Sequence, residues 1–270
     1  MARRTRLDAE LVRRGLARSR EDAAQLIAAG AVKVDGRPAA KAATAVDPAS
    51  AVTVAVDEGP RYVSRGGHKL AGALDAFTGL SVKDRRCLDA GASTGGFTDV
   101  LLRAGAAGVV AVDVGYGQLA WSLQTDERVT VVDRTNVRTL TPDAIGGPCA
   151  VTVADLSFIS LGLVLPALAA CTEPDGDLVP MVKPQFEVGK ERLGSGGVVR
   201  DPELRIEAVL GVAATAATMG LGVAGVVASP LPGPSGNVEF FLWLRRDAPP
   251  VDPAAVRTAV EQAPDPGRAS

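Results

Sequence analysis

The stretch LDAGASTGGFTDVLL, from Leu88 to Leu102, decides the fold of this 270-residue chain. Its first residues are typical of a short buried strand, small residues follow as a loop, and the rest is typical of a helix. Strand, glycine-rich loop and helix in this order predict the first unit of a parallel, doubly wound sheet. Ligands of such sheets bind at the carboxyl ends of the strands, so this loop is the first candidate binding site.

The same alternation of strands and helices continues to about residue 244. Helical patterns at 68–77, 96–104, 117–124, 160–170 and 203–219 separate candidate strands at 85–89, 108–113, 128–133, 150–155, 177–183, 223–228 and 238–244. Strands separated by helices predict an α/β fold with a mostly parallel, seven-stranded sheet and helices on both faces. The last two candidate strands are joined by PLPGPSGN, which predicts an antiparallel hairpin at the sheet edge.

Residues 1–59 predict a separate small module. Two short helices are expected at 7–14 and 19–29, and AVKVDGRP predicts a strand with a tight turn. Residues 1–41 hold ten Lys and Arg against five Asp and Glu, although the whole chain carries a net charge of −2. Such an asymmetry predicts contact between the basic module and nucleic acid. We expect a linker at 60–63, a second domain at 64–246 and a flexible tail at 247–270.

Metal and membrane sites are not favoured by the sequence. The three cysteines are far apart and His68 is the single histidine, so no metal site and a reduced, cytoplasmic protein are expected. Residues 208–238 carry no charge, which leaves a membrane span or a buried helix followed by a strand as alternatives. The glycines of this segment and the lack of flanking basic anchors favour the buried helix and strand.

The glycine-rich loop fits neither common phosphate-binding pattern. A P-loop needs lysine where Phe97 stands, and the spacing of Gly91, Gly95 and Gly96 is not that of a dinucleotide fold. Asp89 would repel a pyrophosphate and attract an amino group or a sulfonium, and Asp113 is placed to accept hydrogen bonds from a ribose. These features favour S-adenosylmethionine. The alternative is that the glycines only let the helix pack against the strand.

Lysines and carboxylates at the strand ends predict a catalytic site. Asp155 and Lys183 end neighbouring candidate strands and should share a pocket, Glu239 opens the last strand, and Lys69 lies just before the sheet. A neutral lysine between two carboxylates can take the proton of a sugar hydroxyl, although the carboxylates favour its charged form. The alternative for each residue is a solvated strand end.

The sequence resembles the TlyA family of ribosomal RNA 2′-O-methyltransferases, which are also called haemolysins. The resemblance covers nearly the whole chain to Arg246 and rests on VSRGGHKL, CLDAGASTGGFTDVLL, VDVGYGQLAW, VADLSFISL, VPMVKPQFEVGK and ASPLPGPSGNVEFFLWL. It implies an N-terminal RNA-binding domain of the ribosomal-protein S-four type and a class I, Rossmann-like methyltransferase domain of the FtsJ superfamily. The family's RAWV linker is replaced here by PRYV, at 60–63.

The resemblance also implies a Lys-Asp-Lys-Glu tetrad, which maps onto Lys69, Asp155, Lys183 and Glu239. Lys183 would deprotonate a cytidine 2′-hydroxyl. Lys69 would hold an RNA phosphate or lower the pKa of Lys183. The expected cofactor-binding residues are Asp89, Gly91, Ala92, Ser93, Thr94, Gly95, Gly96, Phe97, Asp113, Val114 and Asp133.

RNA is expected to contact two groups of residues. The candidates are Arg4, Arg6, Arg20 and Lys41 in the basic module, and Arg65, Arg134, Arg138 and Phe158 near the cofactor. Phe158 is interpreted as a stacking residue or as a core residue, and Arg13 and Arg14 as a solvated helix face. The glycine-rich stretch 188–202 is expected to be a mobile lid.

The implied function is methylation of cytidine riboses in the RNA of both ribosomal subunits by a monomer, with an effect on susceptibility to capreomycin and viomycin. Two other classes stay open. One is a membrane-active haemolysin, for which residues 208–238 are the only candidate segment. The other is a non-catalytic RNA-binding protein with a degenerate methyltransferase fold, against which the intact tetrad speaks.

Overall fold

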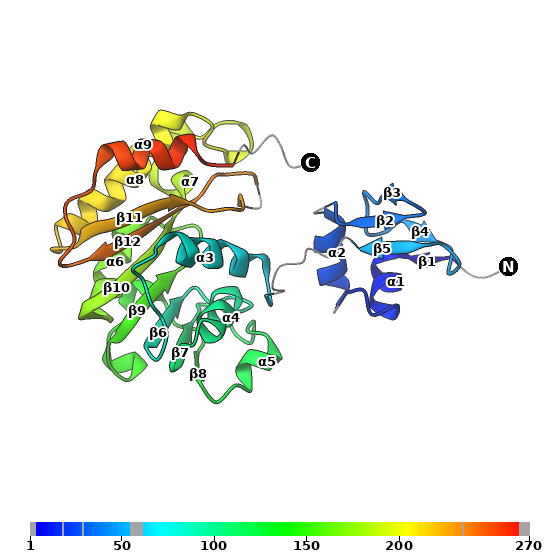
Figure 1. Cartoon of the computed structure of the whole chain (residues 1–270), viewed down its shortest axis with the longest axis horizontal. Coiled ribbons are helices and arrows are strands. Elements are labelled where there is room, and N and C mark those ends of the chain that lie inside the picture. The colour runs from blue at the N-terminus through cyan, green and yellow to red at the C-terminus, as the bar shows by residue number, and fades with distance from the viewer. Residues whose placement is uncertain (1–3, 18, 29, 55–61, 234, 265–270) are drawn as a thin grey trace. The chain divides into compact units, whose positions relative to one another are not determined.

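The computed structural model describes residues 4–17, 19–28, 30–54, 62–233 and 235–264. The chain forms two compact units that separate between Arg61 and Tyr62, and Figure 1 distinguishes them by colour. Residues 60 and 61 of the expected linker lie outside the described residues. Tyr62 and Val63 pack against the core of the second unit, so they are part of that unit.

The N-terminal unit is a small α+β module. Its elements are β1 (Thr5–Arg6), α1 (Leu7–Arg13), α2 (Arg20–Ala28), β2 (Val32–Val34), β3 (Arg37–Pro38), β4 (Ala45–Val46) and β5 (Val52–Val54). β1 pairs with β4, and β2 pairs with both β3 and β5, all antiparallel. Asp35 and Gly36 both have positive φ angles in the β2–β3 turn, as a two-residue hairpin requires. Buried side chains from both helices, among them Leu7, Leu11 and Ile27, form its core.

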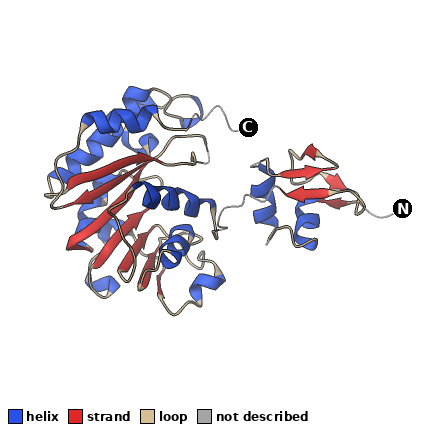
Figure 2. Ribbon diagram, in the orientation of Figure 1, coloured by secondary structure: helices blue, strands red, loops and turns tan. Residues whose placement is uncertain are grey.

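The second unit contains a seven-stranded sheet with the order β11-β12-β10-β9-β6-β7-β8. Its strands are β6 (Arg86–Ala90), β7 (Gly108–Val112), β8 (Val129–Val132), β9 (Cys149–Ala154), β10 (Thr172–Val182), β11 (Gly222–Ala228) and β12 (Phe240–Arg245). Strands β6 to β10 pair in parallel, whereas β12 runs antiparallel to both β10 and β11. The structure therefore confirms the doubly wound α/β fold and the antiparallel edge hairpin (Figure 2).

Helices cover both faces of this sheet. The α-helices are α3 (Arg65–Ala76), α4 (Gly96–Arg103), α5 (Trp121–Gln124), α6 (Leu165–Ala170), α7 (Pro184–Glu187), α8 (Pro202–Ala217) and α9 (Pro253–Glu261). Short 3-10 helices are η1 (Val137–Thr139), η2 (Asp143–Ile145), η3 (Leu161–Leu163), η4 (Lys190–Arg192) and η5 (Ser195–Gly197). Side chains of α6, α8 and α9 share one core with one face of the sheet, and those of α3 and α4 share another core with the opposite face.

Alternation within the parallel strands supplies both cores. In β6, Leu88 and Ala90 belong to the core under α6 and α8, whereas Cys87 belongs to the core under α3 and α4. Successive side chains of a strand point to opposite faces, and a strand covered on both faces is apolar throughout. Asp89 interrupts this apolar pattern in the middle of the sheet, so core packing does not explain why an acid stands at this position.

Two of the expected helices are shorter in the structure. The stretch 117–124 was expected to be helical, but only α5 at its end is, because Gly117 has a φ of +64° and Ala120, with a ψ of 139°, is not helical. The stretch 160–170 divides into η3 and α6, with Ser160 accepting a hydrogen bond from the N–H of Gly162 at the start of η3.

The uncharged segment 208–238 contains the end of α8 and all of β11. Asp201 caps α8 by accepting a hydrogen bond from the N–H of Glu203, and Pro202 stands in its first turn. Among the described residues, no helix has the length and the apolar character needed to cross a membrane.

The expectation of a flexible tail at 247–270 is wrong for residues 253–261. Residues 253–261 form α9, where Asp252 accepts a hydrogen bond from the N–H of Ala254. Val256 and Val260 are buried against the core that α8 covers. The proline and alanine content suggested disorder, but an Asp-Pro pair followed by apolar residues four positions apart is a helix start with one buried stripe.

Replacing Val256 by alanine tests whether α9 is part of the folded unit. Val256 has no exposed surface, so its loss should lower the free energy of unfolding by about 2 kcal/mol. The neighbouring Arg257 forms an exposed ion pair with Glu203, and Arg257→Ala should cost less than about 1 kcal/mol. Urea unfolding of the two variants measures the difference, and equal effects would contradict the packing of α9.

Candidate active site

Lys183 and Asp155 meet at the carboxyl ends of the two neighbouring strands β10 and β9. Lys183 Nζ lies 2.6 Å from Asp155 Oδ1, and it donates a hydrogen bond of 3.0 Å to Ser157 Oγ. The lysine side chain is 9% exposed and that of Asp155 is 24% exposed. Two acceptors therefore fix the ammonium group, and the site remains open to solvent on the side of Asp155.

Lys69 and Glu239 form a second, more deeply buried pair. Lys69 Nζ donates a 2.5 Å hydrogen bond to Glu239 Oε2, and the two side chains are 9% and 1% exposed. Lys69 comes from α3, and Glu239 directly precedes β12. A buried ion pair is kept by its geometry, because removing either partner leaves an uncompensated charge away from water.

The sheet register brings the two pairs together. Val182 is opposite Phe240 in the antiparallel β10–β12 ladder, so Lys183 and Glu239 occupy the next positions at the same edge. Lys183 therefore stands between the strand ends that carry Asp155 and Glu239, but its ion pair is with Asp155, whereas Glu239 pairs with Lys69. Lys69 is buried and paired, which does not suit the expected grip on an RNA phosphate.

Asp89 is a fully buried acid at the centre of the same edge. Its Oδ2 accepts a 2.7 Å hydrogen bond from Thr98 Oγ1, whereas its buried Oδ1 has no hydrogen-bond partner among the described residues. Burial raises the pKa of Asp89 to about 7; the Thr98 hydrogen bond opposes this, and the charges of Asp155 and Asp113 add to it. A buried acceptor without a partner fits the expected contact with an amino group.

Asp113 stands after β7 and organises the cofactor loop. Its Oδ2 accepts a hydrogen bond from the N–H of Ser93 at 2.8 Å, and its Oδ1 accepts one from the N–H of Gly115 at 2.7 Å. Asp133, after β8, accepts a hydrogen bond from the N–H of Gly117 at 2.8 Å. Val114 is 73% exposed between these acids. An exposed apolar side chain flanked by carboxylates suits an adenosine, whose base is flat and whose ribose donates hydrogen bonds.

Two glycines of the loop allow contacts that a side chain would block. A Cβ atom on Gly91 would lie 2.4 Å from the backbone oxygen of Asp155, and Gly91 has a φ of +87°. A Cβ on Gly95 would lie 2.2 Å from Leu123 Cδ1, at a φ of +95°. The expected role of Gly95 in packing and its role in the loop are therefore both compatible with its position.

The remaining loop residues divide by exposure. Ser93 and Thr94 are exposed, whereas Ala92 and Phe97 are buried. The ring of Phe97 packs 5.9 Å from that of Phe241, centroid to centroid. Because the Phe97 side chain belongs to the core, the expected cofactor contact of Ala92, Gly96 and Phe97 would be made by their backbone.

The candidate RNA contacts of the second unit lie on its surface. Arg65, Arg134 and Arg138 are exposed, and the guanidinium of Arg134 lies 4.2 Å from the ring centroid of Tyr116. Phe158 is 91% exposed, has a φ of +64° and lies 5.4 Å from the ring of Phe186. The interpretation of Phe158 as a core residue is therefore wrong.

In the N-terminal unit, Arg6 and Arg20 share the carboxylate of Asp8, at 2.8 and 3.0 Å. Their side chains remain 52% and 60% exposed, and Arg4 and Lys41 are exposed as well. Arg13 and Arg14 instead pair with the buried Glu10.

Three features of the site were missed in the sequence. Ser157 contacts Lys183, and Glu187 accepts hydrogen bonds from Ser160 Oγ at 2.6 Å and from the N–H of Leu161 at 2.9 Å. Asn237 bonds both Val199 and Gly197, so the stretch expected to be a mobile lid is anchored at its centre. Side-chain hydrogen bonds between distant segments leave no periodic pattern in the sequence. The available signal was the serine within DLSF and the glutamate within VKPQFE.

Similarity to known proteins agrees with this geometry. Residues 62–246 match the family model of FtsJ-like methyltransferases, and residues 5–52 match the S4 domain. A Mycobacterium tuberculosis protein named 16S/23S rRNA (cytidine-2′-O)-methyltransferase TlyA is 66% identical over 91% of each chain. The chain belongs to the TlyA family. Like the other FtsJ-like members of this family, it is a methyltransferase.

Two further TlyA relatives carry a different name. Hemolysin A of Brachyspira hyodysenteriae is 35% identical over 87% of this chain and 98% of its own length. A solved structure of a Streptococcus thermophilus protein, also named a hemolysin, is 40% identical, covers 97% of this chain and 96% of its own, and has a TM-score of 0.76. The TlyA fold is thus shared by proteins named for two different activities.

Replacing Asp89 by asparagine should change how stability depends on pH. The unfolded acid has an ordinary pKa of about 4, and the pKa of folded Asp89 is about 7. Between these values the unfolded chain releases this proton first, so the acid lowers stability as pH rises and the loss is complete above about pH 7. The cofactor-free Asp89→Asn variant should melt several degrees above wild type at pH 8 and with little difference at pH 4. An equal pH dependence in both proteins, or the same gain from Asp84→Asn at an exposed acid, would contradict this account.

Replacing Gly91 by alanine should separate the cofactor loop from Asp155. The new Cβ would overlap the Asp155 carbonyl oxygen, and a positive φ adds a strain of about 1 kcal/mol or more. Gly117 has a φ of +64° but open space around its Cβ position, so Gly117→Ala carries the strain alone. Titration with S-adenosylmethionine should find weaker binding by Gly91→Ala than by Gly117→Ala, and similar affinities would exclude the steric explanation.

Proposed function

We propose that this chain transfers a methyl group from S-adenosylmethionine to the 2′-hydroxyl of cytidines in ribosomal RNA. The observation that carries the proposal is the pair of buried lysine–carboxylate contacts at one edge of the sheet, Lys183–Asp155 and Lys69–Glu239. The Mycobacterium tuberculosis relative, named for the RNA of both subunits, supports ribosomal RNA of both subunits as substrates. Action on ribosomes implies the cytoplasm, and an effect on capreomycin and viomycin susceptibility belongs to the same proposal.

The residues at the strand ends fit S-adenosylmethionine. The unpartnered Oδ1 of Asp89 can accept a hydrogen bond from its amino group, and Asp113 retains free lone pairs for the ribose hydroxyls. Val114 and Asp133 would border the adenine, and the exposed Ser93 and Thr94 would line the loop. When bound, this group supplies an electrophilic methyl carbon.

Lys183 would take the proton of the 2′-hydroxyl. Its Nζ is held by Asp155 Oδ1 and Ser157 Oγ. In the neutral amine this would leave the nitrogen lone pair free to face the substrate. In its neutral form the amine accepts the proton while the ribose oxygen becomes the nucleophile, and Asp155 stabilises the ammonium that forms. Asp155 thus opposes the neutral form before the reaction and favours the charged form after it.

Lys69 and Glu239 would fix the geometry of the target ribose. Glu239 is nearly without solvent contact, and it stands opposite Lys183 in the register of β10 and β12. Phe158 would stack on a base next to the target or on the target itself, since RNA enzymes commonly hold splayed bases on aromatic rings. Arg65, Arg134, Arg138 and the basic residues of the S4 domain would contact phosphates.

A membrane-active haemolysin is the second candidate, and the names of two relatives are the observation in its favour. A haemolytic activity does not explain the two lysine–carboxylate pairs at the strand ends. In the non-catalytic alternative the tetrad would be degenerate, whereas here all four residues are in place.

Transfer of tritiated methyl groups to separated ribosomal subunits tests the proposal. Wild type should label RNA of both subunits and block alkaline cleavage after a cytidine, because a methylated 2′-oxygen cannot attack the phosphate. Lys183→Ala should lower the rate on the order of 100-fold or more. Lys83→Ala, at an exposed lysine before β6, is the matched control and should retain the activity.

Each outcome of this experiment has one reading. Label in one subunit only removes the second substrate, and full activity of Lys183→Ala removes the proposed base. No label in either subunit from wild type that binds S-adenosylmethionine contradicts the ribosomal assignment. Release of dye from lipid vesicles by the same preparation would then favour the haemolysin.

A further inference from the structure

The segment 183–187 holds the loop 155–161 at three separate points. Lys183 contacts Asp155 and Ser157 at the start of the loop, and Phe186 packs against Phe158 in its middle. Glu187 binds the end of the loop by accepting hydrogen bonds from Ser160 Oγ and from the N–H of Leu161. One short segment after β10 therefore determines both the position of the catalytic lysine and the shape of the loop.

Phe158 needs such support. It is 91% exposed, and its φ of +64° lies in a backbone region that bulky residues rarely adopt. Strained conformations of this kind persist only where neighbouring contacts fix them. Without its anchor at Ser160 and Leu161, the backbone would relax and the ring would move from its place beside Phe186.

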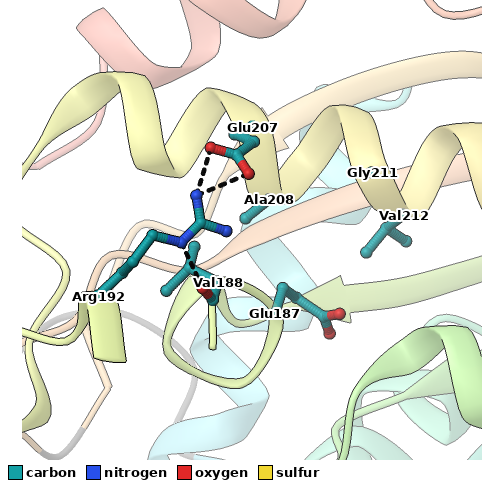
Figure 3. Close-up of a pocket in the computed structure, with 7 residues that line it drawn as sticks. All are labelled: Glu187, Val188, Arg192, Glu207, Ala208, Gly211 and Val212. Carbon is teal, nitrogen blue, oxygen red and sulfur yellow. Dashed lines mark hydrogen bonds and ion pairs between the residues drawn. The ribbon is translucent and has the colours of Figure 1, made fainter. Parts of the chain in front are cut away.

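The Glu187 carboxylate is held by two hydrogen bonds, and Arg192 pairs with Glu207 instead. A cavity of about 270 Å³ borders Glu187, Arg192 and Glu207. Arg192 donates to both carboxylate oxygens of Glu207, and Figure 3 shows the Glu187 carboxylate turned away from that pair. Burial raises the pKa of Glu187, against the effect of its two hydrogen bonds, as is expected of an acid whose neighbours are a hydroxyl and an N–H.

We propose that Glu187 is a positioning residue for RNA recognition, which keeps the loop 155–161 in the shape that presents Phe158 to the base of the target nucleotide. This inference rests on the proposed function. Its action is indirect, because Glu187 touches the loop and not the substrate. A carboxylate is required since both of its oxygens accept hydrogen bonds, whereas an amide has one accepting oxygen.

The first test compares Glu187→Gln with wild type on ribosomal subunits. One of the two loop donors loses its acceptor, so kcat/KM should fall about tenfold, mainly through KM for the RNA, while the affinity for S-adenosylmethionine is unchanged. Glu207→Gln alters a carboxylate at the same cavity that binds only Arg192 among the described residues, and it should behave as wild type.

The second test repeats the substitution where the ring is absent. In a Phe158→Ala background, Glu187→Gln should have little further effect, because both changes remove the same presentation of the ring. A tenfold loss in both backgrounds, or wild-type activity of Glu187→Gln, overturns the inference. Weaker binding of S-adenosylmethionine by Glu187→Gln overturns it too, because the residue would then be structural.

Hydrogen exchange gives a readout that does not depend on activity. Amides of the peptide 155–161 should exchange faster in Glu187→Gln than in wild type or Glu207→Gln, and Ser160→Ala should produce a part of the same increase. Unchanged exchange contradicts the positioning role. If wild type methylates no subunit while the exchange result holds, the proposed function fails and the anchoring of the loop stands as a separate result.

Discussion

The site depends on the burial of two ammonium groups at the carboxyl edge of one sheet. An ammonium removed from water is strongly destabilised unless a carboxylate lies within contact distance. Asp155 and Glu239 supply these contacts, and both stand within one residue of a strand end. Because the strands are fixed by their own ladders, the partners reach the lysines without ordering long flexible loops. The chemistry is therefore stabilised by the same hydrogen bonds that hold the sheet.

The cofactor loop and the catalytic residues form one connected structure. Gly91 lies against the carbonyl of Asp155, and Asp113 binds the backbone of the loop at Ser93. The N–H of Asp155 in turn donates to the carbonyl oxygen of Ala90 at 3.0 Å. A shift of the loop by a fraction of an ångström would thus move Asp155, and through the ion pair it would also move Lys183.

The fold could be predicted from the sequence because its signals are local. Apolar strands, glycine-rich turns and helix caps each depend on a few consecutive residues, and together they indicated the parallel sheet and its antiparallel edge. The strand ends also identified Asp155 and Lys183 as neighbours. The pairing of Glu239 with Lys69 was not predictable, because it depends on how α3 packs beside β12. The order of α9 was not predicted for a related reason: apolar residues and prolines have the same appearance in the sequence whether their segment is packed or solvated. The same ambiguity left Phe158 open between a stacking residue and a core residue.

The separation of Lys69 from Glu239 has a consequence for the synthesis of the protein. The two residues are 170 positions apart, and β12 takes its place between β10 and β11 only after β11 has been made. During translation, the strands from β6 to β10 leave the ribosome before the acid that neutralises Lys69. Until β12 inserts, the growing domain has an open β10 edge and a cation with no partner. The methyltransferase domain can complete its folding only after β12 has been made, so until then the nascent chain exposes that edge and lacks a complete site.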